Sequence, residues 1–365
     1  MNKLTTAGAV LLATTSLAAA GGLDRSGQSI NALFEAGNHV ELSFGSVSPS
    51  VSGTGVGSAG LSTPTGNIAG SYTQVGAAHK GQLTENTSVA IIFDQPFGAD
   101  VNYEVAGYIL GGSAASVTST GVTLLGRQQL NENFSVHGGL RYVSAKGEYV
   151  RPEVTTPNPD DPANPNVTPG YSSTYSSGSG TGFVIGGAYE RKDIALRLAV
   201  TYSGEIDLAL PGSAGNLTTT LPESFNIDFQ TGIAADTLLL ASVRHVNWNG
   251  FSLDDDNPLA GGSILDYDDD VTTYSVGVGR RFSDQFSGSL TIGYEAATDV
   301  PAGNLGPTDG YISYSIGGAY TLENGVKISG GVRYVDLGDA VTEGFGSNFA
   351  GNSAVGLGLK VGYTF

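Results

Sequence analysis

Residues 354–365 read AVGLGLKVGYTF and predict a β-strand with two chemically different faces. Alternate side chains of a strand point to opposite sides. The apolar face runs from Val355 to Phe365 and ends in aromatic residues, whereas the opposite face carries glycines, Lys360 and Thr364. Such a strand fits a soluble sheet packed on a core. It equally fits an outer-membrane barrel whose apolar face meets lipid and whose polar face meets the lumen.

The composition narrows the class of protein. The chain has 365 residues, a formal net charge of −18, no Cys, 55 Gly and 17 Tyr. The acidic charge argues against nucleic-acid binding, which needs cationic surface, and the absence of Cys excludes disulfides and thiolate metal sites. Beyond the N-terminus no apolar run approaches the roughly 18 residues that a membrane-spanning helix needs. Abundant Gly and Tyr favour a sheet with many tight turns and interface aromatics.

Residues 1–20 have the pattern of a signal peptide. Lys3 gives a positive start, Ala7–Ala13 a short apolar core, and Ala18–Ala20 an A-x-A cleavage site. The alternative is a short buried helix, but the small residues before Gly21 favour secretion. We therefore expect a mature chain that begins at Gly21 and folds outside the cytoplasm.

The rest of the chain predicts roughly fourteen antiparallel strands. They lie near 38–52, 71–83, 87–97, 117–130, 134–150, 180–190, 194–210, 223–234, 238–252, 272–283, 286–298, 309–322, 326–338 and 352–365. The segment 21–37 precedes them without strand alternation, so it is either a disordered leader or a small plug inside a barrel.

The connections between these strands alternate between short and long. The short ones are 84–86, 131–133, 191–193, 235–236, 284–285 and 323–325; the long ones are 53–70, 98–116, 151–179, 211–222, 253–271, 299–308 and 339–351. Outer-membrane barrels have short periplasmic turns and longer outer loops, whereas a soluble sandwich has no reason to separate them. We therefore predict an all-β, transmembrane antiparallel β-barrel over 38–365, closed by pairing of 352–365 with 38–52.

An internal repeat supports this topology. The sequence GGLRYV at Gly138–Val143 is echoed by GGVRYV at Gly330–Val335, with ASVRHV at Ala241–Val246 in a matching position. Each copy rises from a short turn, so its aromatic residue reaches the same membrane depth, as an aromatic girdle requires.

If the apolar parity faces lipid, most cations of the strands face the lumen. These inward residues are His137, Arg141, Arg197, Arg244, Arg281, Lys327, Arg333 and Lys360. Two explanations remain open. A charge on a strand avoids lipid, where Arg or Lys costs about 2–4 kcal/mol at the midplane; alternatively, a basic lumen attracts a solute that carries a carboxylate.

Motifs typical of enzymes and metal sites provide little evidence for either function in this sequence. The run 55–60 matches G-x-G-x-x-G without the strand–helix context of a nucleotide site, and no H-E-x-x-H or G-x-S-x-G is present. Ser135 and His137 could form a hydrolase pair, but serines are too common here for this to be informative. The acidic runs 254–256 and 266–270 fit either a divalent-cation site or a solvated loop. We expect a protein that is not an enzyme and has no metal or cofactor.

Between about 221 and 335 the sequence resembles the FadL family of outer-membrane long-chain fatty acid transporters. The resemblance rests on ordered motifs, among them LPESF at Leu221–Phe225, Asn247-Trp248, IGY at Ile292–Tyr294 and Asp309-Gly310. It implies a fourteen-stranded barrel plugged by an N-terminal hatch, here 21–37. It further implies capture of hydrophobic ligands by the outer loops, an inner pocket, and release through hatch rearrangement and the barrel wall. The family's N-P-A motif is absent from this hatch, which reads LFEAGN at Leu33–Asn38.

The leading hypothesis is passive transport of long-chain fatty acids or similar hydrophobic molecules across the outer membrane of a Gram-negative cell. Leu33 and Phe34 would contact ligand tails, and the inward cations would line the path of the head group. The candidate ligand-binding residues are Leu33, Phe34, His137, Arg141, Arg197, Arg244, Lys327 and Arg333. We expect a monomer in contact with outer-membrane lipid and lipopolysaccharide. The alternatives are a general diffusion porin, or a structural or adhesive barrel that binds through loops 151–179 and 253–271.

Overall fold

The computed structural model describes residues 22–57, 60–156, 158, 161 and 163–365. The predicted signal peptide lies outside the described residues. None of the helices in the described part of the chain is long and apolar enough to cross a membrane.

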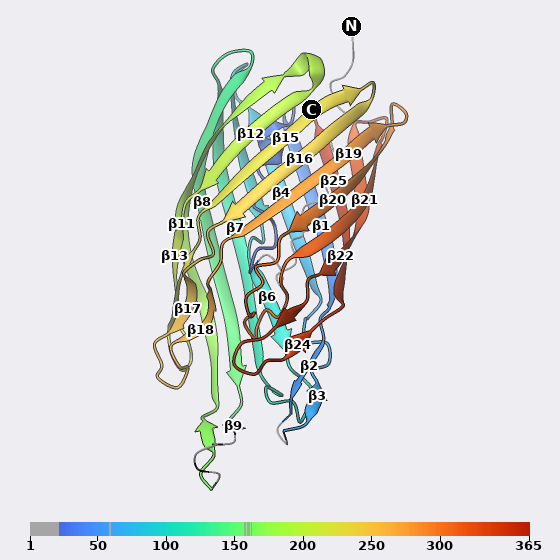
Figure 1. Ribbon diagram of the computed structural model, residues 1–365. Coiled ribbons are helices and arrows are strands. Elements are labelled where there is room, and N and C mark those ends of the chain that lie inside the picture. The colour runs from blue at the N-terminus through green and yellow to red at the C-terminus, as the bar shows by residue number, and fades with distance from the viewer. Residues whose placement is uncertain (1–21, 58–59, 157, 159–160, 162) are drawn as a thin grey trace.

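Fourteen antiparallel strands close into a barrel, as predicted (Figure 1). In spatial order they are β1 (His39–Ser50), β4 (Tyr72–Gln82), β5 (Thr87–Asp94), β7 (Ala114–Gln129), β8 (Phe134–Arg151), β11 (Tyr171–Arg191), β12 (Leu196–Ser203), β15 (Ser224–Ala234), β16 (Thr237–Val246), β19 (Val271–Arg281), β20 (Phe286–Glu295), β21 (Tyr311–Thr321), β22 (Val326–Leu337) and β25 (Asn352–Thr364). The barrel closes because β25 pairs with β1 from His39↔Thr364 to Ser50↔Ser353. Two backbone hydrogen bonds between Asn38 and Phe365 extend this closure by one pair.

The outer face of the barrel is an apolar belt. Along β25 the exposed side chains are Val355, Leu357, Leu359 and Tyr363, the apolar parity of the sequence. Tyr274, Tyr294, Tyr314 and Tyr334 are likewise exposed on neighbouring strands, and register joins Tyr274 to Tyr294 and Tyr314 to Tyr334. An exposed apolar belt of this extent would promote aggregation in water. It matches the lipid-facing surface and aromatic girdle of an outer-membrane barrel.

The two ends of the barrel differ. The tight turns lie at the end where the C-terminus is marked, and the long connections lie at the other end (Figure 1). These connections carry small sheets that the sequence did not predict. They are β2 (Gly53–Val56), β3 (Ser62–Pro64), β23 (Ala340–Val341) and β24 (Asn348–Phe349); β9 (Val154–Thr156) with β10 (Asn166–Thr168); and β13 (Ile206–Leu210), β14 (Leu217–Leu221), β17 (Phe251–Asp255) and β18 (Ser263–Tyr267).

Three predicted strands have different bounds. The strand predicted at 194–210 is broken at Gly204-Glu205 into β12 and β13, which belong to different sheets. The strand predicted at 180–190 begins earlier, at Tyr171, because β8 continues to pair with it as far as Arg151. The strand predicted at 87–97 ends at Asp94; after Gln95 and Pro96 the chain continues as β6 (Gly98–Asn102), which also pairs with β7. Proline cannot donate to a ladder, which explains this last break.

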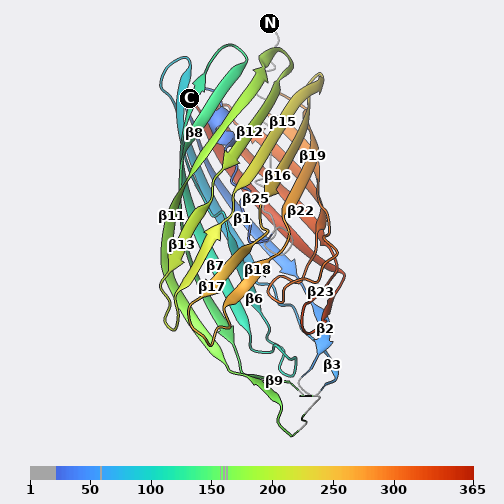
Figure 2. The same ribbon diagram turned by 60° about the vertical axis from the view of Figure 1, so that its left-hand side comes forward.

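The sheet of β13, β14, β17 and β18 contacts β11 through β13, which lies beside β11 in Figure 2. Gly178, Gly180 and Gly182 share the inward parity of buried Val184, and a Cβ on Gly180 would lie 2.3 Å from the carbonyl oxygen of Asp207 in β13. Only glycine permits so close an approach of two backbones. The outer half of the barrel is therefore filled by its own loops.

Candidate ligand site inside the barrel

The N-terminal segment, residues 22–37, runs along inward-facing side chains of the barrel. Leu23 and Leu33 are buried, and the 3-10 helix η1 (Asn31–Phe34) contacts β4 and β5. Near its start the segment pairs with the chain at the end of β5: Arg25 N donates to Pro96 O (2.7 Å), and Gly98 N donates to Leu23 O (2.9 Å). The segment thus supplies backbone partners where the barrel strand is broken.

Charged and polar groups bind the first part of this segment, residues 24–28, to the barrel. The carboxylate of Asp24 accepts a hydrogen bond from Arg244 in a buried ion pair. Arg244 also donates to Asn226 Oδ1 (2.8 Å) and lies 3.5 Å from Gln28 Oε1, while Asn226 donates to Gly27 O (2.9 Å). One arginine therefore joins two barrel strands to the segment.

Phe34 binds the later part of the segment, η1, to the barrel. The guanidinium carbons of Arg127 and Arg197 each lie 4.8 Å from the centre of its ring, and His137 meets the ring edge to face at 5.8 Å. Arg197 also donates to Asn31 Oδ1 (3.0 Å). Cations over an aromatic face are attracted by the ring quadrupole, so three inward side chains hold one residue of η1.

The end of the segment is held at the rim with the tight turns. Lys80 Nζ donates to Gly37 O (2.6 Å), and Lys80 is itself buried. Beside it, Glu41 lies 3.2 Å from His39 Nε2 and 3.3 Å from Lys360 Nζ.

The barrel wall is interrupted beside β5. β4 pairs with β1 from Tyr72 onward but with β5 only from Ala77. Residues 72–76 of β4 therefore have no strand partner on the side of β5. The side chain of Gln95 fills the place: its Oε1 accepts from Val75 N (2.8 Å). The side chain of Gln95 thus supplies one hydrogen-bond partner where a neighbouring strand would lie.

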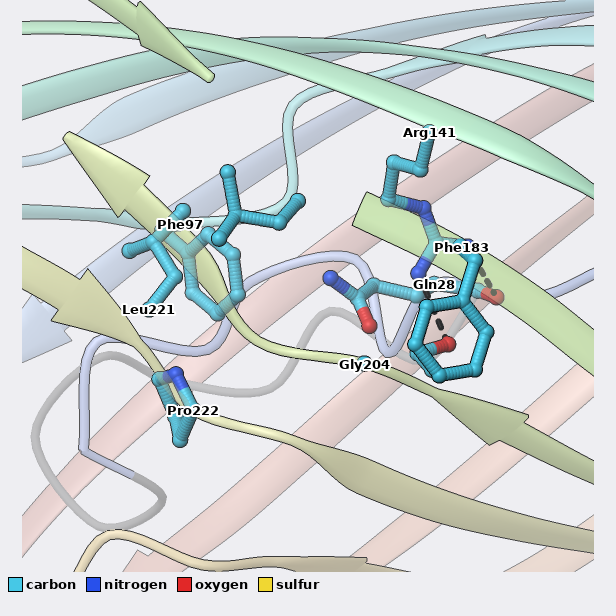
Figure 3. A pocket seen from close by; sticks show the side chains of 9 residues that line it. Gln28, Phe97, Arg141, Phe183, Gly204, Leu221 and Pro222 are labelled. Atoms are coloured by element: carbon cyan, nitrogen blue, oxygen red, sulfur yellow. Dashed lines mark hydrogen bonds between the residues drawn. The ribbon is translucent and has the colours of Figure 1, made fainter. Parts of the chain in front are cut away.

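A small cavity of about 10 Å³, room for one water-sized molecule, lies between the N-terminal segment and the inner face of β8, β11 and β12, with Phe97 in its lining. Figure 3 shows Phe97, Leu221 and Pro222 on one side of the view and Gln28, Arg141 and Phe183 on the other. An apolar cluster adjoins it: Trp248 lies edge to face with Phe97 at 6.1 Å, and the cluster continues through inner-sheet residues of β13, β14 and β17.

Arg141 is the buried cation of this cavity, with 3% of its surface exposed. It donates to Thr123 Oγ1 (2.9 Å) and Ser203 Oγ (3.0 Å), and its third nitrogen lies 3.5 Å from Gln28 O. These acceptors are neutral, and the carboxylates of Asp94 and Asp24 also interact electrostatically with the guanidinium. A guanidinium already desolvated in this way can form charge-assisted hydrogen bonds with an anionic group.

The structure places the eight candidate residues on the lumen side and brings five of them together in two groups. Arg141 and Arg244 meet at Gln28, whereas His137 and Arg197 meet at Phe34. The other two lie apart: Arg333 donates to Ser313 Oγ (2.9 Å), and Lys327 interacts electrostatically with Glu35. Leu33 is fully buried against the wall. The ligand-binding role of these eight residues stays a prediction.

Some of the inward cations form ion pairs, which bears on why they point inward. Besides Arg244 with Asp24, Arg127 pairs with Glu190 and Lys360 with Glu41. These pairs are satisfied within the protein, and avoidance of lipid accounts for their direction. Other inward cations, such as Arg197 and Arg333, donate to neutral acceptors, so the explanation through a solute that carries a carboxylate stays open for them.

Sequence reasoning missed several contributors. Arg127 has the same inward parity as buried Thr123 and Leu125, which would have identified it. Pro96 within a predicted strand signalled the break that aims Phe97 inward. No local pattern marked Gln28, because its partners lie on strands distant in sequence.

The acidic loop runs contribute a polar contact rather than an ion cage. Asp255 is buried and accepts from Tyr171 (2.7 Å) and Tyr175. Within the part of the chain that the structure describes, no group of three or more His, Asp or Glu side chains is arranged to hold a metal ion.

Comparison with known proteins agrees with this geometry. No protein-family model and no curated protein sequence matches the chain. Among solved structures, a Pseudomonas aeruginosa FadL homologue has a TM-score of 0.75 at 14% identity, covering 97% of this chain and 98% of that chain. The Pseudomonas putida toluene transporter TodX has a TM-score of 0.66 at 12% identity, covering 95% and 96%. The Ralstonia pickettii toluene transporter TbuX has a TM-score of 0.59 at 13% identity, covering 90% of each chain.

These likenesses show the fold. At that level the resemblance to the FadL family noted in the sequence is confirmed: the chain has the fold of the FadL homologue and of TodX.

Proposed function

We propose that the protein transports hydrophobic and amphipathic small molecules across the outer membrane, through a barrel that residues 22–37 plug, and catalyses no reaction. The observation that carries this proposal is the cavity where Phe97, Leu221 and Pro222 meet the buried cation Arg141 and Gln28 of the N-terminal segment. An apolar wall with one desolvated cation suits a molecule with a hydrocarbon part and one anionic group.

The preferred substrates in this proposal are long-chain fatty acids. Arg141 would bind the carboxylate, since its present acceptors are neutral hydroxyls and a carbonyl. The tail would displace inner-sheet side chains of the apolar cluster around Trp248. The comparison structures named as toluene transporters make neutral aromatic hydrocarbons the second candidate class. A hydrocarbon would use the same cluster and gain nothing from Arg141.

The route in this proposal leads from the outer loops, through the apolar cluster, to the interruption of the wall beside β5. Movement of the N-terminal segment would release its bonds to Pro96 and Gly98 and free that interruption. A general porin, the first alternative, would need a wide aqueous path. The contacts of the segment with Arg244, Arg127 and Arg197 support a plugged barrel instead.

Trp248 makes a direct test possible, because it is the only tryptophan of the chain and lies in the cluster beside Phe97. The purified barrel in detergent should change its tryptophan emission on titration with oleate, with oleyl alcohol and with toluene. A hydrogen bond to a charged group contributes about 1.5–3 kcal/mol. Arg141→Met should therefore weaken oleate binding roughly 10- to 100-fold and leave oleyl alcohol unchanged.

Arg141→Lys keeps the charge and should retain most of the oleate affinity. Arg191→Met, at an exposed turn residue paired with Asp193, is the matched control. Absence of any emission change with all three compounds would contradict the proposed function. Equal losses for oleate and oleyl alcohol would contradict only the role of Arg141. Heat-dependent migration of the barrel on gels reports whether each variant is folded.

A further inference from the structure

The charges of the chain are divided unevenly between the two ends of the barrel. The long connections between barrel strands are 51–71, 95–113, 152–170, 204–223, 247–270, 296–310 and 338–351, and their sequences contain no Lys, Arg or His. They are rich in carboxylates; the connection 247–270 alone carries Asp254–Asp256, Asp266 and Asp268–Asp270. The formal net charge of −18 is therefore concentrated at the end where these connections lie (Figure 1).

The end with the tight turns carries charges of both signs, which compensate one another. Lys360 lies 3.3 Å from Glu41, and Arg127 pairs with Glu190. Lys327 interacts electrostatically with Glu35 in the same region. The negative potential of the protein therefore arises at the other end.

The carboxylates of the long connections are not neutralised by neighbouring cations. Among the ion pairs of the described residues, only that of Asp270 with His245 Nε2, at 4.0 Å, involves one of these carboxylates. Neutral groups donate to others, as Ser252 Oγ does to Asp254 (2.6 Å). A neutral donor leaves the charge of the carboxylate in place, so the outer end has a strong negative field.

The apolar cluster around Trp248 lies within this field. In the inner sheet of β13, β14, β17 and β18, the buried residues Leu208 and Leu253 belong to the cluster. The residues next to them along the chain, Asp207 and Asp254, are exposed. Neighbouring residues of a strand are about 3.3 Å apart along its axis, well within the Debye length of about 8 Å at physiological salt. A charged ligand that approaches the cluster therefore interacts with these carboxylates through little screening.

The same sheet borders the cavity on which the proposed function rests. Ile206 of β13 and Leu221 of β14 line it together with Arg141. On the proposed route a ligand arrives from the outer loops. It therefore meets the exposed carboxylates first and the buried cation last.

We propose that the outer end is an electrostatic filter, which speeds the capture of cationic amphiphiles and slows the capture of anionic ones, with uncharged amphiphiles between them. Fields of this kind change association rate constants by about 10- to 1000-fold at low salt. The inference rests on the proposed transport and adds the class of ligand that is captured fastest, a long-chain amine. The filter sets how often a carboxylate arrives, whereas Arg141 sets how long a bound carboxylate stays.

The test measures association rates with Trp248 as the reporter and dodecylamine, dodecanol and dodecanoate as ligands. The full mature chain is held in an uncharged detergent near neutral pH, where the amine is cationic and the acid anionic. Stopped-flow emission is recorded at roughly 10 mM and roughly 150 mM salt, where the Debye length is about 30 Å and about 8 Å. At the lower salt the amine should associate at least about tenfold faster than the acid. At the higher salt this ratio should fall to less than about threefold, and dodecanol should not respond to salt.

A variant of the inner sheet locates the filter. Asp207→Asn, Asp254→Asn and Asp266→Asn together remove exposed charges beside the cluster, while asparagine keeps an acceptor oxygen at each position. This variant should slow the amine and speed the acid, each about threefold at the lower salt. The matched control makes the same change in net charge at the tight turns, with Glu85→Gln, Asp284→Asn and Glu323→Gln, all at exposed positions. The control should leave both rates unchanged.

Equal rates for the amine and the acid at the lower salt would overturn the filter, as would a ratio that does not respond to salt. Both results come from the unmodified protein, so they do not depend on the folding of a variant. An equal effect of the inner-sheet variant and its control would overturn the placement of the filter at the outer end. No emission change with any of the ligands, dodecanol included, would overturn the proposed function as well.

Discussion

Replacing Asp24 with Asn removes the charge that holds the start of the N-terminal segment to the barrel. The side chains of Asp24 and Arg244 are only 6% and 11% exposed. Removing one partner of a buried ion pair costs about 3–5 kcal/mol, because the remaining charge stays buried and uncompensated. Even at about 3 kcal/mol, the ratio of docked to undocked segment falls roughly 100-fold.

Planar-bilayer conductance measures this change, since an undocked segment leaves the lumen open to ions. The unmodified protein should carry little steady current, and Asp24→Asn should show frequent openings. The double variant Asp24→Asn, Arg244→Met removes both charges and should carry less current than the single variant, since no uncompensated charge remains. Asp193→Asn breaks the exposed pair with Arg191 and should change nothing.

Two outcomes would refute this reasoning. Unchanged current in Asp24→Asn would mean that the ion pair does not hold the segment in the lumen. A large steady current through the unmodified protein would mean that residues 22–37 do not plug the barrel, and it would favour the general porin.

Three further predictions concern other contacts. Phe34→Ala removes the ring between two guanidinium groups, each contact worth about 0.5–2 kcal/mol, and should make the N-terminal segment more sensitive to added protease than Phe34→Tyr. Gly180→Val places a side chain where β13 lies and should cost about 1–3 kcal/mol by overpacking, seen as a red shift of tryptophan emission; Gly126→Ala, with its nearest neighbour 3.9 Å away, should be silent. Burial raises the pKa of Tyr267 in the inner sheet, so its stabilising contribution is complete below about pH 10 and decreases above it; tryptophan emission should shift at alkaline pH, and less so in Tyr267→Phe.

The barrel could be predicted from sequence because its determinants are local. The alternation of Val355, Leu357 and Leu359 with glycines fixes which face of β25 meets lipid, and one-residue errors in register would reverse every side chain. Short turns such as 235–236 then fix the neighbours. The same reasoning failed at Gly204, where the residues still alternate but the chain turns inward. The choice there depends on the glycines of β11, which admit β13 and lie outside any local window.

The sequence predicted which face of its strand each site residue lies on, but not which residues it contacts. Parity placed Arg141 and Arg244 in the lumen, since parity decides only the face of a strand. Their partners depend on the path of residues 22–37, and Asp24 lies 220 positions from Arg244. Phe34 was expected to contact a ligand tail, whereas the structure shows it held by arginines that parity alone could not bring to one ring.

The end of the ladder between β11 and β12 borders the cavity, and the interruption beside β5 is followed by Phe97, another residue of its lining; the N-terminal segment contacts both. A gap in a membrane-embedded sheet exposes backbone groups that lipid cannot satisfy. Beside β5, Gln95 and the backbone of Leu23 and Arg25 supply hydrogen-bond partners. Between β11 and the strand after it, the ladder ends at Phe183 and resumes only where Ser176 N donates to Pro211 O (2.8 Å). Withdrawal of the segment would therefore remove hydrogen bonds from the wall and Gln28 from the cavity in one movement. Clearing the lumen and loosening the wall are then the same event, and a ligand that displaces Gln28 from Arg141 would favour both.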